Sequence, residues 1–123
     1  MEKILIIDDD KDALTLLQLM LKKNGFAVLT AEHEKQIFTK VATENPSLIL
    51  MDVLLSGADG RMICRKLKDS VHAHIPIIIF SGHPAAQKNF REYGADDFML
   101  KPFQEKALLD KVGKLLTAGK QVG

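Results

Sequence analysis

The sequence predicts an α/β domain with one parallel sheet of five strands and helices on both faces of the sheet. Short apolar segments rich in Ile and Leu alternate along the chain with segments whose apolar residues recur at helical spacing. Strands that alternate strictly with helices form parallel sheets covered by helices. This alternation, without any internal repeat, favours a single domain of this class.

The five expected strands are short and strongly apolar. The third ends on a carboxylate at Asp52, and its apolar residues follow one another without alternation, which is typical of a strand buried on both faces. In the fourth, Pro76 fits near the start, where its missing N–H removes no bond that the sheet needs. The strands are expected, in order, at residues 4–7, 26–30, 48–52, 75–80 and 97–100.

The expected helices follow these strands. In the first, Leu14, Leu17 and Leu21 fall at helical spacing, and Gly25 ends the helix because glycine readily adopts the left-handed conformation of a helix terminus. The fourth begins at Pro84, a residue that suits the first turn of a helix. The helices are expected at residues 10–24, 33–43, 59–69 and 84–93, and the fifth follows Phe103.

Composition is that of an ordinary globular domain. Of the 123 residues, 46% are hydrophobic and 27% charged, enough for a core without disulfides or a structural metal. The formal net charge is +1, from 17 basic and 16 acidic residues, which gives no electrostatic reason to expect nucleic acid or a membrane as a partner. The domain is expected to cover residues 1–119, with residues 120–123 as a frayed tail or the start of a linker.

The cellular compartment is also predicted from the sequence. The single cysteine, Cys64, excludes an internal disulfide and suits a reducing environment. The amino terminus runs directly into the first strand, and no apolar segment approaches the roughly 20 residues that span a bilayer. We therefore expect a soluble, cytoplasmic domain.

Charged or hydroxyl-bearing residues follow four of the five expected strands. Asp8 and Asp9 come after the first strand, Asp52 ends the third, Ser81 follows the fourth and Lys101 follows the fifth. The carboxyl ends of parallel strands open on one edge of the sheet, where α/β proteins bind ligands. We therefore expect these side chains to gather at that edge.

Together these residues predict a phosphoryl-transfer site. Crowded carboxylates repel one another and raise their pKa values, and a divalent cation that prefers oxygen ligands, Mg²⁺ or Mn²⁺, relieves that repulsion. Lys101 could hold one phosphate oxygen and the Ser81 hydroxyl could donate to another. The nucleophile would be a carboxylate, as in enzymes that pass through an aspartyl phosphate.

Each residue alone also has a purely structural interpretation. Asp9 and Asp10 could favour the positive end of the first helix, and Asp52 could cap a loop. Ser81 could be a turn residue, and Lys101 a solvated lysine before a proline. The joint arrangement at four strand ends, in order, favours a common site.

The complete set of motifs consists of Asp8-Asp9, Asp52, Ser81-Gly82 and Lys101-Pro102-Phe103, with further characteristic segments at residues 75–78 and 94–98. This set resembles the receiver domain of two-component response regulators over essentially the whole chain. The resemblance implies a flavodoxin-like fold with strand order 2-1-3-4-5. It also implies that Asp52 accepts a phosphoryl group from a histidine kinase or a histidine phosphotransfer protein.

The resemblance further implies roles at the acidic site. Asp9, Asp52 and the backbone carbonyl of Leu54 would bind Mg²⁺ directly, and Asp8 would assist through water. Lys101 would pair with Asp52 and then with its phosphate.

It also implies a switch. Ser81 would reach for the phosphate and draw its loop inward, with Phe98 as the coupled aromatic residue. The surface of the fourth helix, fifth strand and fifth helix would then change, and could mediate a homodimer. The peptide bond between Lys101 and Pro102 would be cis. The domain would catalyse only its own phosphorylation and dephosphorylation, as a signalling switch and not a metabolic enzyme.

The chain departs from the family pattern at a few positions. Ser56 stands where the family often has proline, and Ser81 replaces the commoner threonine but keeps the hydroxyl. Leu54 and His83 occupy positions that tune the phosphoryl lifetime in the family. Leu54 is apolar and cannot itself position an attacking water, and His83 is expected to face solvent.

Three other functions fit the sequence less well than this one. An aspartyl-nucleophile phosphatase of the haloacid-dehalogenase type needs a second Asp two residues after the first, where this chain has Leu54. A flavin-binding module on the same fold would have its anionic cofactor repelled by the three aspartates after the first strand. A degenerate receiver that acts only as a docking module would not need the intact acid pair, acceptor and lysine.

Overall fold

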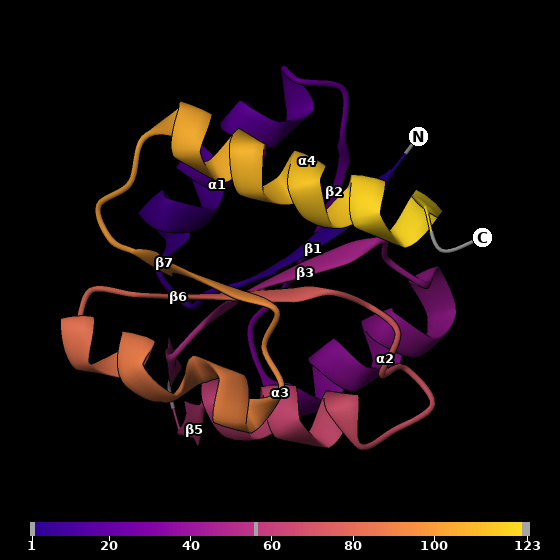
Figure 1. Ribbon diagram of the computed structural model, residues 1–123, viewed down its shortest axis with the longest axis vertical. Helices are drawn as coiled ribbons and strands as arrows, with labels where there is room; N and C mark the ends of the chain where they lie inside the picture. Colours follow the sequence, from indigo (N-terminus) through magenta and orange to yellow (C-terminus); the bar gives the residue numbers. More distant parts are fainter. Residues whose placement is uncertain (1, 56, 122–123) are drawn as a thin grey trace.

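The structure is a five-stranded parallel sheet with helices on both faces, as the sequence predicts (Figure 1). The computed structural model describes residues 2–55 and 57–121. The strands of this sheet are β1 (Lys3–Ile7), β2 (Ala27–Ala31), β3 (Leu48–Asp52), β6 (Ile77–Ser81) and β7 (Asp97–Leu100). They lie in the order β2-β1-β3-β6-β7, which is the order 2-1-3-4-5 implied by the receiver-domain resemblance.

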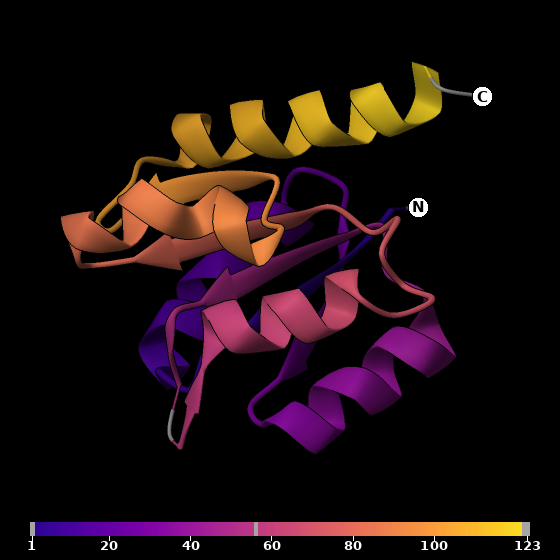
Figure 2. The same ribbon diagram turned by 60° about the horizontal axis from the view of Figure 1, so that its bottom comes forward.

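The helices form one layer on each side of the sheet. The first layer contains α1 (Lys11–Lys22) and α4 (Glu105–Gln121), and the second contains α2 (Glu34–Glu44), α3 (Gly60–Lys68) and the 3₁₀ helix η1 (Pro84–Tyr93). Figures 1 and 2 show the two layers on opposite faces. The sheet is therefore covered from both sides, as parallel sheets require.

The sheet separates two hydrophobic cores, and the side chains of each strand alternate between them. In β3, Leu48 and Leu50 belong to the core beneath α1 and α4, whereas Ile49 and Met51 belong to the core beneath α2, α3 and η1. All four side chains are buried. The continuous apolar sequence of this strand is thus explained by burial on both faces.

Local sequence fixes the ends of the first two helices. Asp10 is the N-cap of α1, and its carboxylate accepts hydrogen bonds from the backbone N–H groups of Asp12 at 3.0 Å and Ala13 at 3.4 Å. Asn45 ends α2 in the left-handed conformation, with φ of 47°, which asparagine tolerates better than most residues. The structural interpretation of Asp10 as a residue of the helix terminus is confirmed.

Asp96 fixes the starts of β6 and β7. Ser81 is the last residue of β6, and Lys101 directly follows β7. The Oδ2 atom of Asp96 accepts hydrogen bonds from the backbone N–H of Ile77 and from the ammonium of Lys68, both at 2.9 Å. Because Lys68 belongs to α3, these bonds join that helix to β6 and to the start of β7.

The segment after Asp52 differs from the expected loop. It contains an antiparallel hairpin of β4 (Leu54–Leu55) and β5 (Ala58–Asp59). Gly57 turns the chain with φ of 75°, a conformation that favours glycine. Ser56, the position where the family often has proline, lies outside the described residues.

Two boundaries and one helix type also differ. The fourth strand of the sheet begins at Ile77, so that Pro76 lies just before it. The fourth helix is a 3₁₀ helix with a kink at Asn89, whereas helical spacing in the sequence does not distinguish this form from an α-helix. The last helix continues to Gln121 and includes the first two residues of the segment expected to be frayed, while residues 122–123 lie outside the described part.

None of the helices within residues 2–55 and 57–121 has the length and apolar character that crossing a membrane requires.

We expect Leu50→Ala to lower the free energy of unfolding by about 2–5 kcal/mol, because the shortened side chain leaves a cavity in the core. Leu50 is 1% exposed. Leu19→Ala is the matched control: this leucine on α1 is 63% exposed, and its truncation should change the free energy by less than about 0.5 kcal/mol. Urea denaturation followed by circular dichroism measures both, and equal losses in the two variants would contradict the assignment of the core.

Candidate functional site

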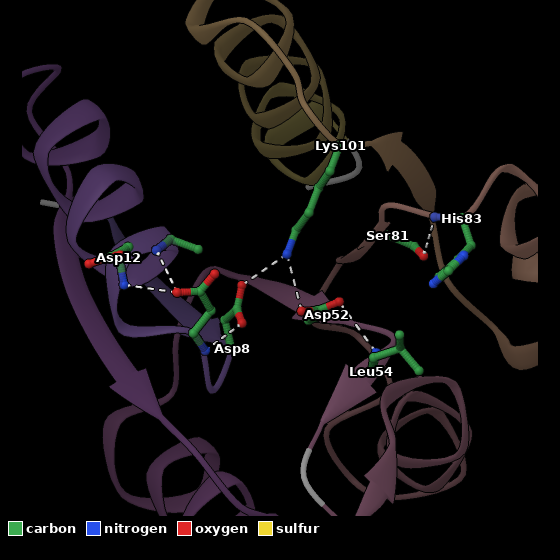
Figure 3. Close-up of polar contacts among 9 residues, drawn as sticks. Asp8, Asp12, Asp52, Leu54, Ser81, His83 and Lys101 are labelled. Carbon is green, nitrogen blue, oxygen red and sulfur yellow. Dashed lines mark hydrogen bonds and ion pairs between the residues drawn. The ribbon is translucent and has the colours of Figure 1, made fainter.

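Four of the predicted site residues lie at one edge of the sheet (Figure 3). Asp8 follows β1, Asp52 and Ser81 are the last residues of β3 and β6, and Lys101 follows β7. These four strands are parallel and adjacent in the sheet, so their carboxyl ends point the same way. Asp8 and Lys101 thereby come into contact although they are 93 positions apart in the sequence.

The ammonium of Lys101 forms ion pairs with two buried carboxylates. Its Nζ atom lies 3.2 Å from Asp8 Oδ2 and 3.1 Å from Asp52 Oδ2. Asp8 is fully buried and Asp52 is 8% exposed, whereas the Lys101 side chain is 28% exposed. The peptide bond between Lys101 and Pro102 is cis, as the resemblance implies. One positive charge therefore faces two negative ones.

This imbalance shifts the pKa values of the site. Burial raises the pKa of Asp52 above its ordinary value of 3.8, repulsion from Asp8 adds to this, and attraction to Lys101 offsets the two effects only in part. Burial alone would lower the pKa of Lys101, but the two carboxylates together hold it above its ordinary value of 10.5. Lys101 is therefore charged at neutral pH, and the surroundings of Asp52 favour a second cation.

Backbone N–H groups orient both carboxylates. The N–H of Asp10 donates to Asp8 Oδ1 at 2.9 Å, and the N–H of Leu54 donates to Asp52 Oδ1 at 3.3 Å. Asp8 thus lies beside the amino end of α1, whose partial positive charge also stabilises a carboxylate. Each acid uses one oxygen for a backbone donor and the other for Lys101.

The third predicted carboxylate, Asp9, lies in the same loop as Asp8, but its side chain is exposed. In the described part of the chain, no three acidic, histidine or cysteine side chains are close enough together to hold a metal ion. The structure therefore brings Asp8 and Asp52 together with Lys101, and the part of Asp9 in a metal site stays a prediction.

Ser81 and Phe98 are both buried close to η1. The Ser81 hydroxyl accepts a hydrogen bond from the backbone N–H of His83 at 3.0 Å, and the His83 side chain is exposed as expected. Phe98 stacks on Phe90 of η1 with ring centroids 6.0 Å apart. Leu54 exposes its apolar side chain and offers only its backbone to the site.

Two residues of this edge, Gly60 and Phe80, are not identified by the sequence. A Cβ atom on Gly60 would collide with the backbone carbonyl of Asp52. The backbone N–H of Gly60 donates a hydrogen bond to the carbonyl of Val53 at 2.8 Å. The ring of Phe80 lies 4.7 Å from Lys101 Nζ. The available signals were a glycine at the start of a predicted helix and an aromatic residue ending an Ile-rich strand.

We expect Gly60→Ala to lower the free energy of unfolding by about 1–3 kcal/mol, because the new methyl group forces the backbone at Asp52 to move. Gly113→Ala in α4 is the matched control. Nothing lies within 4 Å of its added Cβ, so this change should stabilise the protein by about 0.5–1 kcal/mol through helix propensity. Thermal denaturation measures both, and shifts of the same sign would refute the close approach at Gly60.

Comparison with known sequences identifies relatives along nearly the whole chain. The family model for the response regulator receiver domain matches residues 4–113. The chain is 35% identical over 120 residues to the alkaline phosphatase synthesis transcriptional regulatory protein PhoP of Bacillus subtilis, covering 94% of this chain and 48% of that protein. It is 30% identical over 119 residues to the transcriptional regulatory protein ResD of the same organism, covering 97% and 50%. The chain thus spans about half the length of these curated relatives.

Solved structures agree with the sequence comparison. A CheY-like response regulator receiver domain protein from Methanospirillum hungatei has a TM-score of 0.92 at 26% identity, covering 100% of this chain and 99% of that one. A two-component response regulator from Clostridium difficile has a TM-score of 0.87 at 28% identity, covering 95% and 97%. This chain belongs to the response regulator receiver domain family, as the family match and the similarity of its fold to solved receiver domains together show.

Proposed function

We propose that this receiver domain accepts a phosphoryl group on Asp52 from a histidine kinase or a histidine phosphotransfer protein, in a reaction that requires Mg²⁺ or Mn²⁺. The observation that carries the proposal is the single ammonium of Lys101 shared by Asp8 and Asp52. The Asp52 side chain is 11% exposed at the edge of the sheet, which leaves it open to a donor. Its pKa is raised by burial, and a more basic carboxylate is the better nucleophile.

A divalent cation fits the donors at this edge. Asp52 would offer a carboxylate oxygen, the kind of ligand that Mg²⁺ prefers, and Asp8 would assist through water. The single ammonium of Lys101 leaves these two acids short of positive charge. We propose Asp9, in the same loop as Asp8, and the backbone carbonyl of Leu54 as further ligands. When bound, the cation supplies the missing positive charge and stabilises negative charge on the phosphoryl oxygens.

The transfer itself exchanges one bond to phosphorus for another. A carboxylate oxygen of Asp52 attacks phosphorus while the bond from phosphorus to the donor's imidazole nitrogen breaks. The nitrogen keeps the electron pair and takes a proton, and the product on Asp52 is an acyl phosphate. Lys101, whose ammonium is 3.1 Å from Asp52, then donates to a phosphoryl oxygen, and the Ser81 hydroxyl donates to another.

The signal leaves the site through Ser81 and Phe98. The Ser81 hydroxyl accepts a hydrogen bond from the backbone N–H of His83 at 3.0 Å, and η1 begins at the next residue. When the hydroxyl turns towards the phosphate, it therefore draws the His83 backbone and the start of η1 with it. Phe98 of β7 stacks on Phe90 of η1, so the two elements move together. Phosphorylation then favours one of two arrangements of this surface.

The surface that changes consists of η1, β7 and α4. We propose that two copies of the chain can form a homodimer through this surface. Lys111 of α4 lies 3.0 Å from Asp97 of β7, and this ion pair ties the two elements together. A shift of β7 is thereby passed to α4.

Two alternatives have less support. A phosphatase with Asp52 as nucleophile needs a general acid at residue 54, where the structure has an exposed leucine. A receiver that only docks a partner gains nothing from two buried acids around a lysine, which are costly to desolvate.

Phosphoramidate and Mg²⁺ should add one phosphoryl group to the chain, detected by intact mass spectrometry. The adduct should be absent without the metal and absent in Asp52→Asn, because both the nucleophile and the added charge are required. Asp69→Asn is the matched control, since Asp69 is an exposed carboxylate paired with Arg65 on α3, and it should be phosphorylated like the wild type.

An adduct that persists in Asp52→Asn would contradict the assignment of the acceptor. No adduct on the wild type, with Mg²⁺ binding demonstrated and no phosphate released into solution, would contradict the phosphoacceptor role and favour the docking module.

A further inference from the structure

The ammonium of Lys101 lies over the face of the Phe80 ring. Its Nζ atom is 4.7 Å from the ring centroid, a distance at which an aromatic face attracts a cation. The same atom lies 3.2 Å from Asp8 Oδ2 and 3.1 Å from Asp52 Oδ2. Lys101 therefore has two carboxylates and one aromatic ring around its charge.

The Phe80 ring is itself held in place. It is buried in the core beneath α1 and α4, and it meets the Phe103 ring at a centroid distance of 6.2 Å and an interplanar angle of 76°, an edge-to-face contact. Phe103 follows Lys101 by two residues, so the loop that carries the lysine also packs on the ring. The Lys101 backbone N–H donates to the Ser81 carbonyl at 2.8 Å, beside Phe80 in the strand.

This ring attracts the ammonium whatever the charge on the carboxylates. The lysine side chain is long and flexible, and its charge can be placed in several ways. Its ion pairs with Asp8 and Asp52 weaken when a cation binds the same oxygens or when Asp52 becomes an acyl phosphate. The ring has no charge to lose. Phe80 follows Ile78 and Ile79 in β6. An isoleucine in place of Phe80 would also fill the space, but it would give the ammonium no electrostatic partner.

We propose that Phe80 is a positioning residue for phosphoryl transfer: its ring holds the Lys101 ammonium beside Asp52 while the charges of the two carboxylates change. The inference rests on the proposed function of Asp52. Phe80 acts through Lys101 and does not touch the phosphoryl group.

Site-specific incorporation of mono-, di- and trifluorophenylalanine at residue 80 tests this role. Fluorine withdraws electron density from the ring face and weakens its attraction for a cation, while the shape of the side chain is nearly kept. Two quantities are measured. The first is the pKa of the Lys101 ammonium, by NMR of lysine labelled at Cε, without metal or phosphodonor. The second is the rate of phosphorylation by phosphoramidate and Mg²⁺.

Both quantities should fall stepwise with the number of fluorine atoms, and the rate should fall roughly threefold to tenfold at the trifluorinated ring. The same series at Phe38 is the matched control, because this residue of α2 packs against the opposite core, and neither quantity should change there. Phe80→Leu should slow the reaction at least as much as the trifluorinated ring, with its thermal midpoint recording the loss of packing separately.

A Lys101 pKa that stays constant across the series at residue 80 would overturn the inference, as would a falling pKa with an unchanged rate. A wild-type chain that takes up no phosphoryl group would contradict the proposed function instead. The Lys101 pKa would then still decide whether the Phe80 ring holds the ammonium.

Discussion

The shared ammonium of Lys101 is the interaction on which the rest of this site depends. Removing a carboxylate from water costs several kcal/mol, and here two of them, Asp8 and Asp52, are buried together. Lys101 and two backbone N–H groups make this burial tolerable, yet one cation cannot balance two anions. The site is thus held together but electrostatically incomplete. That incompleteness supports the proposal that the site binds a metal cation before Asp52 accepts a phosphoryl group.

The register of the sheet creates this arrangement. Ile7 of β1 pairs with Met51 of β3, so the next residues, Asp8 and Asp52, emerge side by side. Asp52 in turn pairs with Phe80 of β6, and the loop after β7 brings Lys101 over that ring. The strands cannot slip, because a shift of one residue would move every buried side chain to the wrong core. The packing of the core therefore sets distances at the site as well as stabilising the fold.

Much of the fold follows from patterns that are visible locally. Continuous apolar strands, helical spacing and residues at strand ends predicted the five-stranded sheet and the meeting of Asp8, Asp52, Ser81 and Lys101. The hairpin after Asp52 was missed because strands of two residues have no periodicity to detect. Residue spacing does not encode the direction in which a side chain points, and the exposure of Asp9 depends on that direction. The contact of Phe80 with Lys101 depends in addition on the path of the loop after β7. Glycine is required at residue 60 because the chain there passes close to the Asp52 carbonyl. The sequence does not encode this close approach, which only the folded structure shows.

The most direct measurement is the titration of the Asp52 carboxyl carbon by NMR in metal-free protein. We expect a pKa above the ordinary 3.8, because burial and Asp8 disfavour the charged form of Asp52 more than Lys101 favours it. Since the pKa is raised in the folded state, ionisation of Asp52 costs stability as pH rises through that value, and Asp52→Asn should relieve the cost at neutral pH. Added Mg²⁺ should lower the pKa. A pKa at or below 3.8 without metal would contradict the claim that this pair of acids lacks positive charge.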